Sequence, residues 1–120
     1  QREVADRLAA SPGSKQYGPL TVTVQAQCSV RRALTLKPGC FFPPPKVDSA
    51  VVELVRRDAP LTADPDRLAR LLQTLFSQRR KQLGRTLGRG FPWPEGVDPT
   101  HRPEQLDIAT LESLAARQKD

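Results

Sequence analysis

The sequence predicts an α/β chain whose strands lie in its first half and whose helices fill its second half. Residues 49–55 are almost continuously apolar and β-branched, which is typical of a strand buried on both faces. After Asp64, apolar residues recur at helical spacing instead. The chain has 120 residues, 38% of them hydrophobic, and 12 prolines, so we expect a modest core with several stiff loops. The change from strands to helices falls near residue 60.

The first residues, 1–10, predict a helix because Val4, Ala5 and Leu8 fall on one face. No capping residue precedes this helix, which suggests that the chain is a piece of something larger. We expect the helix to end at Ser11-Pro12-Gly13 and a loop to follow it. Residues 20–28 alternate between apolar and polar side chains, so their pattern alone predicts a strand.

A second strand is expected over residues 29–36. Residues 37–46 then hold four prolines, which predicts an extended loop that is poor in hydrogen bonds. A linker over residues 56–63 leads to Asp64, the expected N-cap of a helix with Pro65 in its first turn. The core-facing stripe of that helix is Leu68, Leu71, Leu72, Leu75 and Phe76.

Three glycines, at positions 84, 88 and 90, should shorten whatever helix comes next. Residues 91–99 predict a loop in which Phe91 and Trp93 are buried as packing plugs. Asp107 is the expected cap of a last helix. Its predicted apolar face is Ile108, Leu111, Leu114 and Ala115.

The charge and the missing signatures restrict the function. A net charge of +6 favours a polyanionic partner, although some small domains are basic for solubility alone. No apolar run is long enough for a membrane span, and the first ten residues are too charged for a signal peptide. Cys28 and Cys40 are expected to be reduced and unpaired, and with the single His101 they cannot supply four zinc ligands. Residue chemistry alone names no catalytic acid, base or nucleophile.

Two segments could carry function, and each has a structural alternative. Phe41 and Phe42 precede three prolines; the pair either anchors a loop to the core or presents a stiff stacking surface for a nucleobase. Residues 78–89 carry five cations with no acidic residue among them. On a helix, Arg79 and Arg80 would face solvent, either as a solvated helix end or as phosphate contacts.

These segments resemble a known family, the ribosomal RNA adenine dimethyltransferases (KsgA/RsmA), which are related to the Erm methyltransferases. Phe41-x-Pro43-x-Pro45-Lys46-Val47-x-Ser49 is similar to the family's late FxPxPxVxS motif, and residues 76–83 are similar to its first C-terminal helix. Residues 1–25 and Arg102-Pro103-Glu104-x-Leu106 also resemble family segments, in the same order along the chain. Where relatives carry Arg-Asn after the QRRK segment, this chain has Gly84-Arg85.

The resemblance implies a fold, and it overrides one pattern. Residues 1–57 would be the end of a Rossmann-like methyltransferase domain, and residues 58–120 a small helical domain that docks on rRNA. The family places residues 18–27 in a helix that Thr21 could cap, and we follow it there. The Gly-rich loop and the NLPY tetrapeptide of the family are not in this sequence.

The resemblance also implies an activity. The enzyme would transfer methyl groups from S-adenosylmethionine to N6 of two adjacent adenines in a hairpin loop of 16S rRNA during ribosome biogenesis in the cytoplasm. Its partners would be small-subunit rRNA and 30S precursor particles, and it would act as a monomer with no membrane and no metal. Phe41 would stack on the flipped adenine, whereas Phe42 would pack in the core. Phosphates would contact Arg79, Arg80, Lys81 and Arg85.

The 120 residues alone are expected to be inactive and to hold no binding site for the cofactor. A non-enzymatic RNA-binding module is therefore the main alternative function. A helix-turn-helix DNA-binding unit over residues 65–90 is a third.

Overall fold

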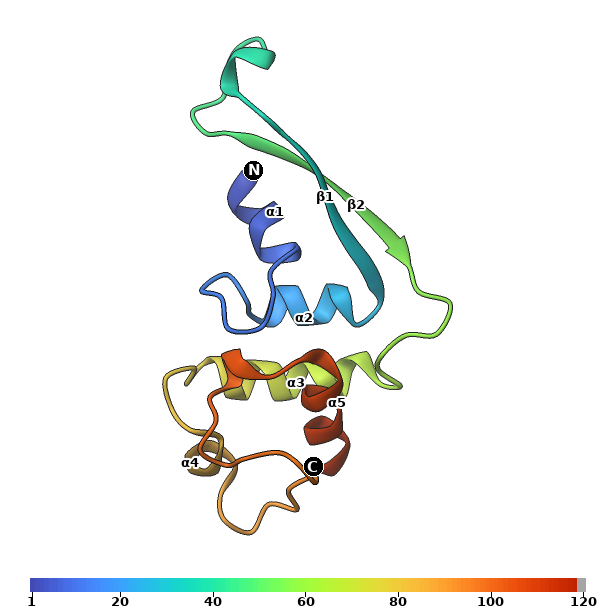
Figure 1. Ribbon diagram of the computed structural model, residues 1–120, viewed down its shortest axis with the longest axis vertical. Coiled ribbons are helices and arrows are strands. Elements are labelled where there is room, and N and C mark those ends of the chain that lie inside the picture. The colour runs from blue at the N-terminus through green and yellow to red at the C-terminus, as the bar shows by residue number, and fades with distance from the viewer. Residues whose placement is uncertain (119–120) are drawn as a thin grey trace.

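The computed structural model describes residues 1–118 and forms an elongated molecule of 56 × 32 × 23 Å. A long two-stranded hairpin occupies the upper part of Figure 1, and a cluster of helices occupies the lower part. The elements are α1 (Arg2–Leu8), α2 (Pro19–Gln25), β1 (Cys28–Leu36), the 3-10 turn η1 (Pro38–Cys40), β2 (Ser49–Arg56), α3 (Pro65–Phe76), α4 (Leu83–Leu87), the 3-10 turn η2 (Pro103–Gln105) and α5 (Ile108–Arg117).

The hairpin pairs β1 with β2 in antiparallel register, from Cys28 opposite Arg56 to Leu36 opposite Ser49. Both predicted strands are confirmed. The prediction that β2 is buried on both faces is wrong, because Leu54 and Val55 are 49% and 51% exposed. Helices α1 and α2 pack along one side of the hairpin, and no other element within residues 1–118 covers its opposite side.

Residues 19–25 form the helix α2, so the strand predicted from alternation is wrong and the expectation from the family is confirmed. The N-cap is Gly18 rather than Thr21, and Pro19 occupies the first turn. The Thr21 hydroxyl accepts a hydrogen bond from the Gly18 N–H at 3.1 Å and donates to the Arg7 carbonyl. Thr21 and Val22 are both buried, so this contact with α1 stabilises a helix that local pattern does not indicate.

The predicted caps of α3 and α5 are confirmed. The Asp64 carboxylate accepts from the Arg67 N–H at 3.1 Å, and the Asp107 carboxylate accepts from the Thr110 N–H at 2.8 Å. The apolar faces of the two helices pack together in one core, which Tyr17 and Val22 complete from the other side. The buried leucines that α3 and α5 contribute to it are Leu68, Leu71, Leu72, Leu75, Leu111 and Leu114.

Helix α4 is short and ends at Leu87; the C-cap Gly88 has a φ of +88°, which suits a residue without a side chain. Gly84 lies against Pro99, where an added Cβ would be 3.2 Å from the proline Cβ. Phe91 and Trp93 meet edge to face at 5.0 Å and pack against the core, although both are only partly buried rather than buried as predicted. Within residues 1–118, every helix is too short or too polar to span a bilayer.

Candidate nucleic-acid interface

The proline loop, residues 37–48, forms the tip of the hairpin and projects past the ends of both strands (Figure 1). The Phe41 side chain is 41% exposed there, and Phe42 is 99% exposed. The prediction that Phe42 packs in the core is therefore wrong, because the tip lies far from the helices that enclose the core. Three consecutive prolines follow the rings and restrict the backbone that carries them.

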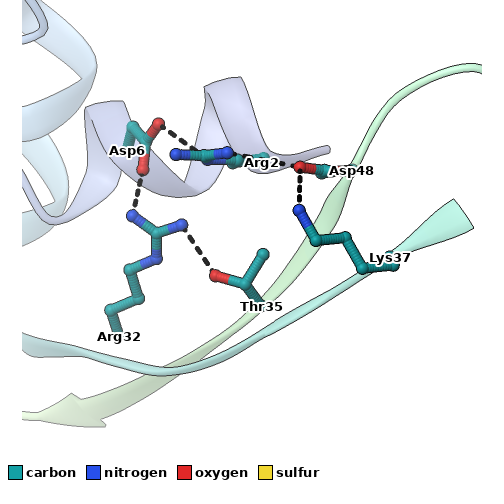
Figure 2. A network of polar contacts seen from close by, with 6 residues as sticks. All are labelled: Arg2, Asp6, Arg32, Thr35, Lys37 and Asp48. Carbon is teal, nitrogen blue, oxygen red and sulfur yellow. Dashed lines mark hydrogen bonds and ion pairs between the residues drawn. The ribbon is translucent and has the colours of Figure 1, made fainter.

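A network of ion pairs joins the base of this loop to the start of α1 (Figure 2). Asp48 accepts from the Arg2 guanidinium at 3.2 Å and from the Lys37 ammonium at 3.5 Å. Arg2 also lies 3.9 Å from Asp6, which pairs in turn with Arg32. Sequence reasoning missed Asp48, because its partners come from two segments that only the fold brings together.

Arg79 and Arg80 do not lie on a helix, so the expectation for this part of the basic segment is wrong. Helix α3 ends at Phe76, and residues 77–80 form turns. Arg79 is half-buried rather than solvent-facing: it donates to the Tyr17 carbonyl and to Glu104, both at 3.1 Å. Its guanidinium also lies 5.7 Å from the centre of the Phe76 ring. Both hydrogen bonds come from one terminal nitrogen, Nη2, so they fix the position of the Arg79 guanidinium against the protein.

Tyr17, whose backbone carbonyl accepts the hydrogen bond from Arg79, is itself buried. Its hydroxyl donates to the Leu106 carbonyl at 2.6 Å. Burial, together with the nearby charge of Asp107, raises the pKa of Tyr17 to about 12. The phenol therefore stays neutral, and keeps its hydrogen bond, at pH values above the ordinary pKa of tyrosine.

The other predicted cations are free to meet a ligand. Arg80, Lys81 and Arg85 are exposed, and within residues 1–118 none of the three pairs with a carboxylate. Arg80 also borders a groove of about 410 Å³ that is lined by Lys15, Arg79, Arg80, Arg102 and Glu104. Lys15 and Arg102 were missed by sequence reasoning, since nothing local indicates that they meet Arg80.

The fold thus separates the two candidate surfaces. The loop that carries Phe41, residues 37–48, forms the hairpin tip, whereas the segment that carries the cations, residues 79–85, lies between α3 and the end of α4 in the helical half (Figure 1). Cys28 and Cys40 are both free, as expected. Among residues 1–118, no three His, Cys, Asp or Glu side chains gather closely enough to hold a metal ion.

The chain is an α/β fragment with a small sheet, and the solved structures that it resembles are Rossmann-like methyltransferases. A dimethyladenosine transferase from Plasmodium falciparum superposes with a TM-score of 0.81 at 26% identity, over 95% of this chain and 53% of that one. The 23S rRNA methyltransferase ErmE superposes with a TM-score of 0.70 at 24% identity, over 98% of this chain and 51% of that one.

Sequence comparison narrows the class to one family. The family model described as "Ribosomal RNA adenine dimethylase" matches residues 1–114, and the chain belongs to that family. Proteins named ribosomal RNA small subunit methyltransferase A are similar to it: 48% identical in Xanthomonas campestris pv. campestris and 45% in Pseudomonas aeruginosa, each over 96% of this chain. The chain spans about half the length of these curated relatives, 46% and 45% respectively.

Proposed function

We propose that this chain acts in a 16S rRNA adenine N6,N6-dimethyltransferase that modifies two adjacent adenines of small-subunit rRNA. Residues 1–57 would belong to the Rossmann-like methyltransferase domain, and residues 58–120 would form a helical domain that docks on 30S precursor particles. The setting would be ribosome biogenesis in the cytoplasm, with the enzyme as a monomer. Membership of the family and the names of its relatives support this proposal.

The observation that carries the proposal is the position of Phe41. An adenine inside a duplex or a stacked loop hides its N6, so the base must be extruded and held. Phe41 offers an aromatic face, 41% exposed, on a loop stiffened by prolines. Stacking of a base on such a face contributes about 1–3 kcal/mol. We assign Phe41 the role of holding the target adenine.

The cations in the helical half would bind the rRNA backbone. Arg80, Lys81 and Arg85 are exposed, so their charges can meet phosphates without sequence specificity. Arg79 belongs to the same surface in our proposal, but Glu104 offsets its charge at 3.1 Å. We therefore expect Arg79 to contribute less to phosphate binding than Arg80.

The family implies S-adenosylmethionine as the methyl donor, and the described residues do not fit a site for it. A groove of about 400 Å³ lies beside the start of α1, and its carboxylates are Glu3, Asp6 and Asp48. Glu3 pairs with Arg7, and the other two belong to the network around Arg2. Each of these carboxylates already has a cationic partner, and the sequence holds no Gly-rich loop to receive the cofactor. The chemistry that we assign to this chain is therefore RNA binding and base positioning.

The poor fit of the described residues to a cofactor site favours a second candidate function. In it, this chain is an RNA-binding module that does not itself transfer methyl groups. We expect the 120-residue chain by itself to show no methyltransferase activity and no cofactor binding in a calorimetric titration. A helix-turn-helix reader over residues 65–90 is disfavoured, because α4 has only five residues to enter a groove.

Substitution of Phe41 in the methyltransferase tests the proposal. Phe41→Ala should slow methylation of small-subunit particles by about 5- to 150-fold, which corresponds to the removal of one stacking face of about 1–3 kcal/mol. Phe41→Tyr should retain most of the rate, since tyrosine also offers an aromatic face. Equal rates for the wild type and Phe41→Ala would contradict the assigned role.

A further inference from the structure

The proline loop has a near limb, residues 37–41, and a far limb, residues 42–47, and the far limb makes few hydrogen bonds to the rest of the protein. Residues 43–45 are prolines and have no N–H to donate. In the near limb, Cys40 and Phe41 donate to the carbonyls of Lys37 and Pro38, at 3.0 and 3.2 Å. Within residues 1–118, no backbone hydrogen bond between elements involves residues 42–47. The two near-limb bonds are also local and join the loop to no other element, so the orientation of the whole loop, with Phe41 in it, depends on what holds its two ends, at Lys37 and Asp48.

Asp48 is attached to two other segments at once. Its carboxylate oxygen Oδ2 receives both the Arg2 guanidinium, at 3.2 Å, and the Lys37 ammonium, at 3.5 Å. Its carbonyl accepts from the Arg2 N–H at 3.1 Å. Lys37 stands at the start of the loop and Asp48 at its end, so the second ion pair closes the loop at its base (Figure 2).

The partners of Asp48 are held in place themselves. Arg2 is shared with Asp6, which also pairs with Arg32 on β1, and Arg32 donates to the Thr35 hydroxyl at 3.0 Å. The Asp48 side chain is only 23% exposed, although Lys37 is 76% exposed. Exposed ion pairs add little to global stability, so the main effect of this network is geometric.

We propose that Asp48 is a positioning residue: it fastens the proline loop to α1 and β1 and so sets the orientation of the Phe41 ring. The inference rests on the proposed function for its catalytic consequence, but not for the anchoring itself. Without this anchor the Phe41 ring would sample many orientations. It would still be exposed to RNA, but it would less often contact an extruded adenine in the reactive geometry.

The anchoring can be measured directly, because Cys40 is exposed in this loop. With Cys28→Ser in the background, a nitroxide label on Cys40 reports local mobility by electron paramagnetic resonance. Asp48→Asn should increase the mobile fraction, and Lys37→Gln should increase it less because Arg2 still holds Asp48. The matched control is Glu53→Gln, which removes a carboxylate of the same hairpin that pairs with Arg31 at 3.1 Å. The control should leave the spectrum unchanged.

The catalytic consequence is measured with the complete methyltransferase and small-subunit particles. Asp48→Asn should lower kcat on the order of 10-fold while KM stays nearly unchanged, because the cations that bind phosphate are in the other half. Glu53→Gln should leave both constants as they are.

The outcomes separate the two ideas. Unchanged mobility in both Asp48→Asn and Lys37→Gln would overturn the inference. So would a large fall in melting temperature in Asp48→Asn, if Lys37→Gln leaves mobility unaltered. Greater mobility with normal kcat would support the anchoring and contradict the role of Phe41. Greater mobility together with lower kcat would support both.

Discussion

The helical half and the hairpin are stabilised in different ways. In the helical half, Leu71, Leu72 and Leu75 of α3 are fully buried against α5 and Tyr17. In the hairpin, about half of the Leu54 side chain is exposed, and the contacts are ladder hydrogen bonds and ion pairs. The first region depends on apolar burial and the second on backbone pairing and charge. Substitutions in the core should therefore change stability, and substitutions at the hairpin tip should change function.

The largest expected effect comes from the core. Leu72→Ala should lower the free energy of unfolding by about 2–5 kcal/mol, because it leaves a cavity in a fully buried site. The control is Leu54→Ala, which removes the same atoms from a side chain that is 49% exposed and should cost much less. Denaturant unfolding of the purified protein measures both. Equal effects would show that the hairpin is packed as tightly as the helices.

Tyr17 makes the stability of the helical half depend on alkaline pH. Its pKa is raised from 10.0 to about 12 in the folded state. The folded state therefore favours the neutral phenol: the stabilisation is fully present below pH 10 and disappears as the pH rises toward 12. Tyr17 is the only tyrosine of the sequence, so tyrosinate absorbance reports it alone. Ionisation near pH 10 in the folded protein would contradict the buried hydrogen bond to Leu106.

The two neighbouring arginines of the basic segment should behave differently. Arg79→Ala should lower the free energy of unfolding by about 1–3 kcal/mol, because it leaves Glu104 and the Tyr17 carbonyl without their partner. Arg80→Ala should leave stability unchanged but weaken binding to small-subunit particles. The slope of its affinity against salt concentration should shrink by roughly 0.7–0.9, because one phosphate is no longer neutralised.

Thermal melts and binding at several salt concentrations separate these two arginines. A stable Arg79→Ala variant would mean that the arginine is free to bind RNA, as its sequence pattern indicates. An Arg80→Ala variant with an unaltered salt slope would reduce Arg80 to a solvated surface residue.

Local signals predicted much of the fold, and long-range contacts decided the rest. Asp64 and Asp107 cap their helices as predicted, because a cap acts within three residues. The alternation of Thr and Val over residues 20–25 wrongly predicted a strand. The start at Gly18-Pro19 and the contact of Thr21 with Arg7 stabilise a helix there instead. These stabilising contacts involve residues outside the alternating run.

The candidate site shows the same division. The exposure of Arg80 follows from a run of charges, and the structure agrees. Arg79 meets Glu104, 25 residues later, so no local pattern could reveal that it is half-buried. Phe41 and Phe42 look alike in sequence, and only their place at the hairpin tip distinguishes them: the more exposed ring is Phe42.

The smallest stability effect should come from that ring. Phe42→Ala removes a side chain that is 99% exposed, so no cavity forms and the unfolding free energy should change by no more than about 0.5 kcal/mol. Its partner in the comparison is Phe91→Ala, which removes a ring that packs on Trp93 and the core and should clearly lower the melting temperature. Circular dichroism melts of the two variants decide the matter. A Phe42→Ala variant that melts as early as Phe91→Ala would mean that the tip is packed, and the contrast between a stabilising core and a functional hairpin tip would fail at its clearest residue.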